Sequence, residues 1–319
     1  MNVRDENEYE DLLAEWSDLE SGIGVVLRNP DTAQQFVARV LQYDNWMQGL
    51  LQRDQDVGLY LLFQLAGNSA VGYSASHALV SAVLCQLMAK ELALPLTERD
   101  SLVRAAFTMN VAMTAMQDVL ANQTDRPTLE QQDMIRNHPV KAAMLLGNLG
   151  VQDQKWLDIV SMHHDESLEH VELNQLTPSQ RLTRILKMVD RYAAMISPRM
   201  TRAGRTATES ARSIMASAAE KTDEIAHALV KVVGMCPPGT FVRLDTAEVA
   251  VVVKRSSQAN QPLVAIVTTA EGELLRIPRL HATAQAYPHI KQALGAGVVH
   301  APLSHYFILQ MSSHMKAEV

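Results

Sequence analysis

The spacing of apolar residues changes after about residue 235, and the two parts of the chain predict different kinds of structure. Before that point, apolar side chains recur three and four residues apart, as at Leu79, Val83 and Leu87, which is the period of a helix with one buried face. The helical pattern covers residues 8–94, 99–122, 129–150, 154–164, 178–196 and 206–234. Successive helices without intervening strands exclude an alternating βα architecture and predict a mainly α fold.

Local signals predict where one helix begins and where the helical part ends. Asp31 and Thr32 follow Pro30, and short oxygen-bearing side chains cap the first free N–H groups of a helix. We therefore expect a capped helix to start after Pro30. The run 236–239, Cys-Pro-Pro-Gly, cannot continue a helix and predicts a boundary.

Short β-branched runs follow this boundary and predict a small antiparallel β unit. The predicted strands are Phe241–Leu244, Val249–Val253, Leu263–Thr268 and Leu274–Ile277. From Thr283 onward the pattern is weak, and we assign no chemistry to it. The predicted division is an N-terminal helical segment at 1–60, a helical domain at 61–236, the β unit at 237–290 and a C-terminal tail at 291–319.

Composition and charge narrow the classes of function. The chain has 319 residues, 47% of them hydrophobic, which is enough for a substantial core and more than one folding unit. The net charge of −7, from 28 Lys and Arg against 35 Asp and Glu, excludes a global basic field that would attract nucleic acid or an anionic membrane. Because no long apolar run and no signal-peptide pattern is present, we expect a cytoplasmic protein. Cys85 and Cys236 lack metal-ligand spacing and are interpreted as small core hydrophobes.

Four histidines and one aspartate lie at or near the ends of successive predicted helices. They are His77, His138, the doublet His163-His164 and Asp190. Adjacent helical residues point about 100° apart, so the doublet can serve one site only where its helix ends. Taken singly, each histidine is more often a hydrogen-bonded core or surface residue, but their order and spacing together indicate a shared site.

The order of these motifs resembles an HD-GYP domain of the HD phosphohydrolase superfamily, over roughly residues 60–270. The motifs that carry the resemblance are His77, His138-Pro139, His163-His164, Asp190-Arg191-Tyr192 and the Pro-Pro-Gly-Thr run at 237–240 with the β unit behind it. The resemblance implies an HD-domain helical bundle with N-terminal helices. It also implies two or three iron or manganese ions and hydrolysis of the bacterial messenger cyclic di-GMP.

The resemblance also assigns roles to individual residues. It makes metal ligands of five side chains, namely His77, His138, His163, His164 and Asp190. It places Arg199 and Arg202 at two basic positions that hold the phosphates of the messenger, a task for which the guanidinium fork is suited. The alternative, that both arginines are solvated loop residues, stays open.

The chain departs from the family pattern at several positions. Met109 and Asn110 stand where the family has its His-Asp doublet, and Met113 stands where it has a lysine. Tyr73 replaces an acidic residue one turn before His77, and residues 165–177 contain no Gly, Tyr or Pro. A neutral amide cannot supply the bridging anion, and a thioether is too soft to replace an imidazole for iron or manganese.

Charge balance then predicts a module without catalytic residues. The remaining set offers neutral imidazoles and a single carboxylate, Asp190, which balances two divalent ions poorly. We expect an inactive ligand-binding or protein-interaction module in bacterial cyclic di-GMP signalling, with cyclic di-GMP, a diguanylate cyclase or another signalling protein as partner. The alternative is a metal-dependent phosphohydrolase or phosphodiesterase with a single ion on His138, His163 and His164. That ion is iron or manganese by resemblance, or zinc by ligand type.

A third interpretation concerns the N-terminal helices. Trp16, Trp46 and the apolar run Leu59–Leu65 could form a homodimer surface. Such residues are more often part of a core.

Overall fold

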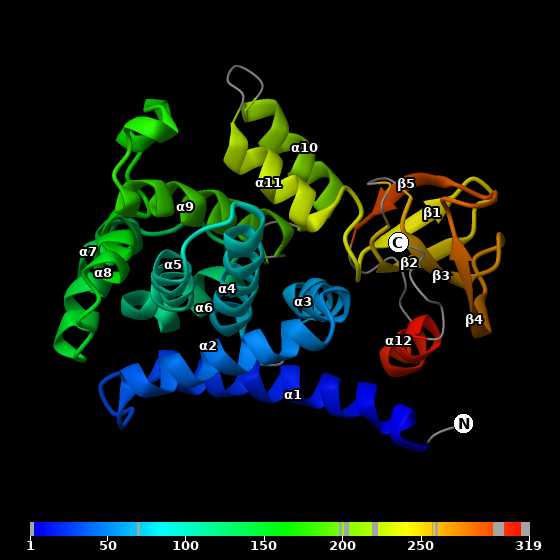
Figure 1. Cartoon of the computed structure of the whole chain (residues 1–319), viewed down its shortest axis with the longest axis horizontal. Coiled ribbons are helices and arrows are strands. Elements are labelled where there is room, and N and C mark those ends of the chain that lie inside the picture. The colour runs from blue at the N-terminus through cyan, green and yellow to red at the C-terminus, as the bar shows by residue number, and fades with distance from the viewer. Residues whose placement is uncertain are drawn as a thin grey trace.

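In the computed structural model, helices form the first part of the chain and a sheet follows (Figure 1). The structure describes residues 3–68, 71–197, 200, 204–218, 223–256, 258, 261–295 and 303–313. The helices before the sheet are α1 Val3–Arg28, α2 Phe36–Arg53, α3 Gln55–Asn68, α4 Tyr73–Glu91, α5 Leu96–Thr108, α6 Thr114–Asn122, α7 Leu129–Asn148, α8 Gln154–Met162, α9 Pro178–Ile196, α10 Ala207–Ala218 and α11 Glu224–Val233. The prediction of a mainly α fold with a small C-terminal β unit is confirmed.

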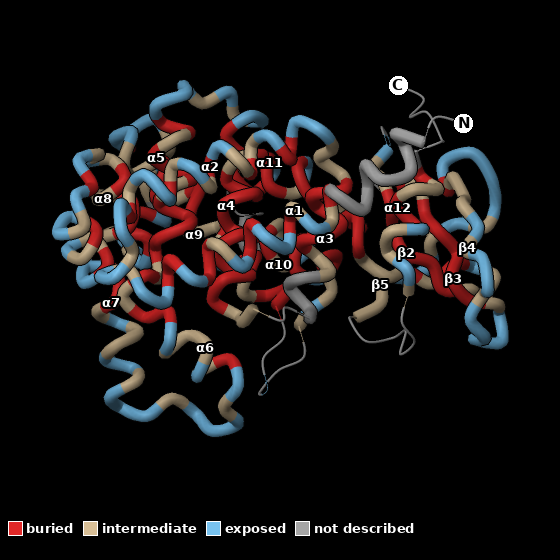
Figure 2. Tube along the Cα trace, turned by 90° about the horizontal axis from the view of Figure 1, so that it is seen from below, coloured by how far each residue is buried: buried red, intermediate tan, exposed pale blue. Residues whose placement is uncertain are grey.

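Helix α4 is the centre of the helical part. Its residues are small or apolar on nearly every face, and most of them are buried, as expected for a helix enclosed by others. It contacts α1, α3, α5, α6, α9 and α11, and buried segments are concentrated around it and α9 (Figure 2). None of the described helices has the length and apolar character needed to cross a lipid bilayer.

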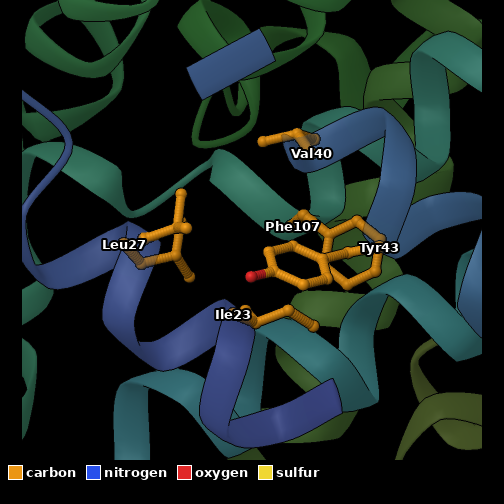
Figure 3. A pocket seen from close by; sticks show the side chains of 6 residues that line it. Ile23, Leu27, Val40, Tyr43 and Phe107 are labelled. Carbon is orange, nitrogen blue, oxygen red and sulfur yellow. The ribbon is translucent and has the colours of Figure 1, made fainter. Parts of the chain in front are cut away.

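The N-terminal helices pack against this core. Trp16 and Leu59 are almost fully buried, at 1% and 0% exposure, so they are core residues rather than part of an open surface. Where α1 meets α2 and α5, apolar side chains surround a void of about 10 Å³ (Figure 3). The residues around this void are Ile23, Val26, Leu27, Val40, Tyr43 and Phe107. A void of this size and polarity is a packing defect rather than a ligand site.

The predicted helix start at Asp31 and Thr32 is wrong. Helix α2 begins at Phe36, and the residue before it, Gln35, has a left-handed backbone (φ 56°) and provides no side-chain cap. The Thr32 hydroxyl donates to the carbonyl of Asn29 at 3.3 Å instead of accepting from a free N–H. The polar residues after Asn29 therefore form a turn, because their side chains bond backward along the chain.

The stretch 206–234, for which the sequence predicted a helical pattern without an internal boundary, contains two helices, α10 and α11. Asp223 caps the second, since its carboxylate accepts from the backbone N–H groups of Ile225 and Ala226 at 3.0 and 3.4 Å. An N-cap inside an apolar periodic stretch marks a new start. Periodicity alone did not reveal this break.

The β unit is a five-stranded antiparallel sheet with strand order β4-β3-β2-β1-β5. Its strands are β1 Phe241–Leu244, β2 Val249–Lys254, β3 Leu263–Thr268, β4 Leu274–Ala282 and β5 Ile290–Leu294. The four predicted strands are confirmed, and β4 extends further than predicted. Strand β5 and helix α12 (His305–Ser313) lie in the part that the sequence pattern left unassigned.

The sheet is docked on helix α3. Arg255 pairs with Asp56 of α3 at 2.5 Å, and the Gln64 side chain donates to the carbonyl of Gly239. Gly239 has φ +87°, and a Cβ at this position would lie 2.3 Å from the carbonyl oxygen of Tyr60. Glycine is therefore required where the chain leaves the helices for the sheet.

Candidate functional site

Capping residues set the starts of helices α7, α8 and α9, which carry or precede most of the candidate site residues. Thr128 and Gln131 form a capping box at the start of α7, and Thr177 and Gln180 form another at the start of α9. Asp153 caps α8 by accepting from the backbone N–H of Trp156 at 3.2 Å. Because a cap defines the first residue of a helix, these short motifs determine which side chains face inward further along.

The structure brings three histidines together, which we call the histidine triad: His138, His163 and His164. His138 lies inside α7, and the other two follow the last residue of α8, where the helix ends. One ring nitrogen from each lies within 4.8 Å of those of the other two. The ring centroids are 5.0 Å apart for His138 with each of the doublet and 4.3 Å apart within the doublet. The end of α8 is thus what allows adjacent histidines to face one site.

Backbone contacts determine which nitrogens of His138 and His163 carry hydrogen. The Nδ1 of His138 lies 2.7 Å from the carbonyl of Ile135, and the Nδ1 of His163 lies 2.7 Å from that of Val160. A carbonyl can only accept, so both Nδ1 atoms donate, and in neutral rings both Nε2 atoms are bare. These two Nε2 atoms face each other at 3.1 Å. Two facing lone pairs repel unless a cation lies between them.

This arrangement fits a metal ion. Bonds of about 2.1 Å from an ion to two imidazole nitrogens convert the 3.1 Å separation into an angle of about 95° at the ion, an ordinary coordination angle. Metal-ligating histidines usually donate their other N–H to a carbonyl or carboxylate, as His138 and His163 do. The triad therefore has both the first ligands and the supporting contacts of a metal site.

Burial keeps two triad members neutral. Burial, together with the smaller effect of the neighbouring His164, lowers the pKa of His138 to about 4 and that of His163 to about 3. Both are almost fully buried, at 3% and 1% exposure, whereas His164 is exposed. Neutral imidazole is the form that binds metal, and the exposed ring marks the side from which solvent reaches the triad.

The other two predicted ligands contact each other. The Nε2 of His77, in α4, lies 2.8 Å from Oδ1 of Asp190, in α9. Burial alone would raise the pKa of Asp190, but the hydrogen bond and charge of His77, together with His163 and His164, hold it well below its usual range. The His77 ring stacks on Tyr73, with centroids 5.6 Å apart and planes 11° apart. The Nδ1 of His77 is buried and has no hydrogen-bond partner among the described residues.

The positions Met109, Asn110 and Met113, which depart from the family pattern, provide neither an imidazole nor a carboxylate. Met109 and Met113 are 1% and 7% exposed and belong to the buried apolar residues. Asn110 is half-buried, and its backbone carbonyl accepts from the N–H of Met113 at 2.8 Å. Thioethers and a neutral amide cannot replace an imidazole and a bridging carboxylate for a hard cation.

Sequence reasoning missed Lys187, which holds the segment after the triad. This lysine lies in α9, three residues before Asp190, and its Nζ donates to the carbonyl of Asp165 at 3.2 Å. The same Nζ pairs with Glu169 at 2.7 Å. The spacing from Asp190 places both side chains on one face of α9, a signal that could have identified it. Arg199 and Arg202 lie outside the described residues.

Comparison with known proteins agrees with this geometry. The HD domain matches residues 60–225, more than half of the chain. A cyclic di-GMP phosphodiesterase of Pseudomonas aeruginosa is 25% identical over 194 residues, which cover 59% of this chain and 46% of that protein. The chain thus spans about half the length of this relative. No solved structure matches the chain. The matched region contains the histidine triad, His77 and Asp190, and the chain belongs to the HD-domain family of phosphohydrolase-like proteins.

Proposed function

We propose that this HD-domain protein has lost hydrolysis and acts as a ligand-binding or protein-interaction module in bacterial cyclic di-GMP signalling. The observation that carries the proposal is the pair Met109 and Asn110 at the position of the family doublet. Met109 is 1% exposed and packs among apolar side chains. Asn110 is a neutral amide where the family has its bridging aspartate. Two metal ions and an activated water between them therefore have no bridging anion to support them.

The charge around the triad supports this proposal. In-line hydrolysis of a phosphodiester needs an activated water and positive charge placed against the developing negative charge. The carboxylate of Asp190 interacts electrostatically with His163 and His164, and its Oδ1 already accepts from His77 at 2.8 Å. A carboxylate engaged in this way is a poor general base.

We propose cyclic di-GMP as the ligand. The relative in Pseudomonas aeruginosa is named a cyclic di-GMP phosphodiesterase, which supports this choice of ligand. In this proposal Arg199 and Arg202 hold phosphate oxygens with their guanidinium groups, and a metal ion on the triad adds positive charge on the exposed His164 side. A diguanylate cyclase or another signalling protein is the partner class that such a module would bind.

The test is to measure cyclic di-GMP binding by calorimetry and turnover by chromatography on one metal-loaded sample of the full chain. We expect binding without product, and weakened binding in the double variant Arg199→Ala/Arg202→Ala. Arg243→Ala, at a half-buried arginine of strand β1 outside the helical domain, is the matched control and should bind cyclic di-GMP as the wild type does. Hydrolysis product in molar excess over the protein would show repeated turnover and contradict the proposal.

A second candidate is a phosphohydrolase with one metal ion. The facing Nε2 atoms of His138 and His163, 3.1 Å apart, favour it specifically. An ion held there supplies Lewis-acid polarisation of a phosphoryl oxygen and lowers the pKa of a bound water. His138, His163 and His164 would hold the ion, with the exposed His164 on the side open to solvent. Under this candidate, His163→Ala abolishes a measurable turnover that the wild type shows.

A further inference from the structure

We infer that the hydrogen bond between His77 and Asp190 occupies the place of a second metal ion, so that each chain binds a single ion, on the histidine triad. The inference rests on the triad as the metal site of the proposed function and says which residues remain outside it. By residue type alone, both His77 and Asp190 would be assigned as metal ligands.

The contacts of the second ring nitrogen separate the two groups. A metal-ligating histidine normally donates its other N–H to a carbonyl or carboxylate, which fixes the tautomer. His138 and His163 both do so at 2.7 Å. His77 does not, because its Nδ1 is buried and has no hydrogen-bond partner in the part of the chain that the structure describes. No described acceptor therefore holds a hydrogen on Nδ1 of His77. Without such an acceptor, Nε2 is not kept free of hydrogen for binding an ion.

The contact of His77 with Asp190 is complete without a cation. A hydrogen on Nε2 of His77 points at the carboxylate Oδ1, 2.8 Å away, and an N–H donor and a carboxylate acceptor attract. The facing nitrogens of His138 and His163 are both acceptors and attract only through a cation. The 2.8 Å contact of the pair is thus a hydrogen bond, whereas the 3.1 Å contact in the triad brings two acceptors together and needs a cation.

The residues at the positions that depart from the family pattern add neither an imidazole nor a carboxylate to the pair. Tyr73 stacks its ring on His77, Met109 is buried among apolar residues, and Asn110 is neutral. Among the described residues, the triad is the one group of at least three His, Cys, Asp or Glu side chains whose ligand atoms converge within 4.8 Å. A second divalent ion would therefore meet one carboxylate and one imidazole, too few to displace its water.

The pair instead joins two helices. His77 is 2% exposed on the central helix α4, and Asp190 lies on α9, which packs against it. A partly buried, charge-assisted hydrogen bond between them holds these helices together in the absence of metal. The consequence is that loss of the pair affects the stability of the fold, while loss of a triad member affects metal content.

The test is the number of ions bound per full-length chain. Protein stripped with a chelator is titrated with Zn²⁺, and separately with Mn²⁺, and the bound metal is measured by elemental analysis after desalting. We expect one ion in the wild type, one in His77→Ala and Asp190→Asn, and none in His163→Ala. His227→Ala, at an exposed histidine whose Nδ1 lies 2.9 Å from the backbone carbonyl of Asp223, is the control and should also bind one ion.

The outcomes distinguish this inference from the proposed site. Two ions in the wild type, with one lost in His77→Ala or Asp190→Asn, would overturn the inference and leave the triad in place. No ion in the wild type, or an unchanged ion in His163→Ala, would overturn the triad itself.

A measurement on the wild type covers the case in which a variant fails to fold. Nitrogen-15 NMR of the histidine side chains should show Nε2 of His77 bearing hydrogen both without metal and at saturating Zn²⁺, while Nε2 of His138 and His163 shift on loading. Loss of the hydrogen from Nε2 of His77 on loading would overturn the inference.

Discussion

The histidine triad and the His77–Asp190 pair lie in one helical domain and use the same kinds of side chain, yet their surroundings prepare them for different chemistry. In the triad, backbone carbonyls hold the hydrogens of His138 and His163 away from the centre, so two bare nitrogens meet at 3.1 Å. In the pair, imidazole and carboxylate already satisfy each other at 2.8 Å. Residue type alone is therefore insufficient to assign a metal ligand. For a histidine, the hydrogen-bond partner of the second ring nitrogen decides whether the first is free to bind a metal ion.

The largest expected effect is the acid sensitivity of the metal-free fold. His138 and His163 have folded-state pKa values of about 4 and about 3, below the unfolded value of about 6.5. The unfolded state therefore binds more protons as the pH falls below about 6.5, and the free energy of unfolding decreases until the pH passes the folded values. Each histidine contributes about 1.4 kcal/mol per pH unit in this window.

Urea unfolding of chelated protein at several pH values between 7 and 4.5 measures this dependence. His163→Ala should remove about half of the histidine contribution to the slope. His227→Ala, at an exposed histidine, should leave the slope unchanged. Identical slopes in the wild type and His163→Ala would show that the triad is not kept neutral by burial.

Metal binding should stabilise the fold through the triad alone. An ion that binds only the folded state adds about 2.7 kcal/mol at a free concentration one hundred times its dissociation constant. We expect Zn²⁺ to raise the melting temperature of the wild type and of Asp190→Asn, and to leave that of His163→Ala unchanged. Chelator should reverse the increase. A response in His163→Ala as large as in the wild type would place the ion elsewhere.

Breaking the pair should destabilise the chain without metal. Asp190→Ala leaves the buried N–H of His77 without an acceptor, which costs about 1–3 kcal/mol. Denaturant unfolding of the chelated protein measures the loss. Ser167→Ala, in the exposed segment after the triad, is a suitable control with little expected change. Full stability of Asp190→Ala would argue that the hydrogen bond does not join α4 and α9 as described.

The smallest effect tests how the triad is positioned. Thr128→Ala removes the cap of α7, which carries His138, and should cost about 1 kcal/mol. Thr128→Ser retains the hydroxyl and should retain the stability. Both variants should still bind metal, since the cap lies two to three turns from His138. A loss of metal in Thr128→Ala would mean that the start of α7 controls the register of the triad.

Much of this protein was predictable from sequence because its signals are local. Apolar periodicity predicted helices such as α7 and α9, and β-branched runs predicted four strands, since side-chain period follows backbone geometry. The order of the histidines and Asp190 predicted a shared site and the HD-domain family. The replacement of the His-Asp doublet by Met109 and Asn110 was also visible, because residue type by itself limits ligand chemistry.

The tertiary structure decided what depends on neighbours distant in the chain. Strand β5 has little pattern of its own and forms by pairing with β1, while α2 starts late because Thr32 bonds backward to Asn29. Within the site, His77 and Asp190 are 113 residues apart, and no sequence pattern says that they bond to each other. Hydrogen positions on an imidazole follow from the atoms that surround it, and the packing of helices against one another determines which atoms those are.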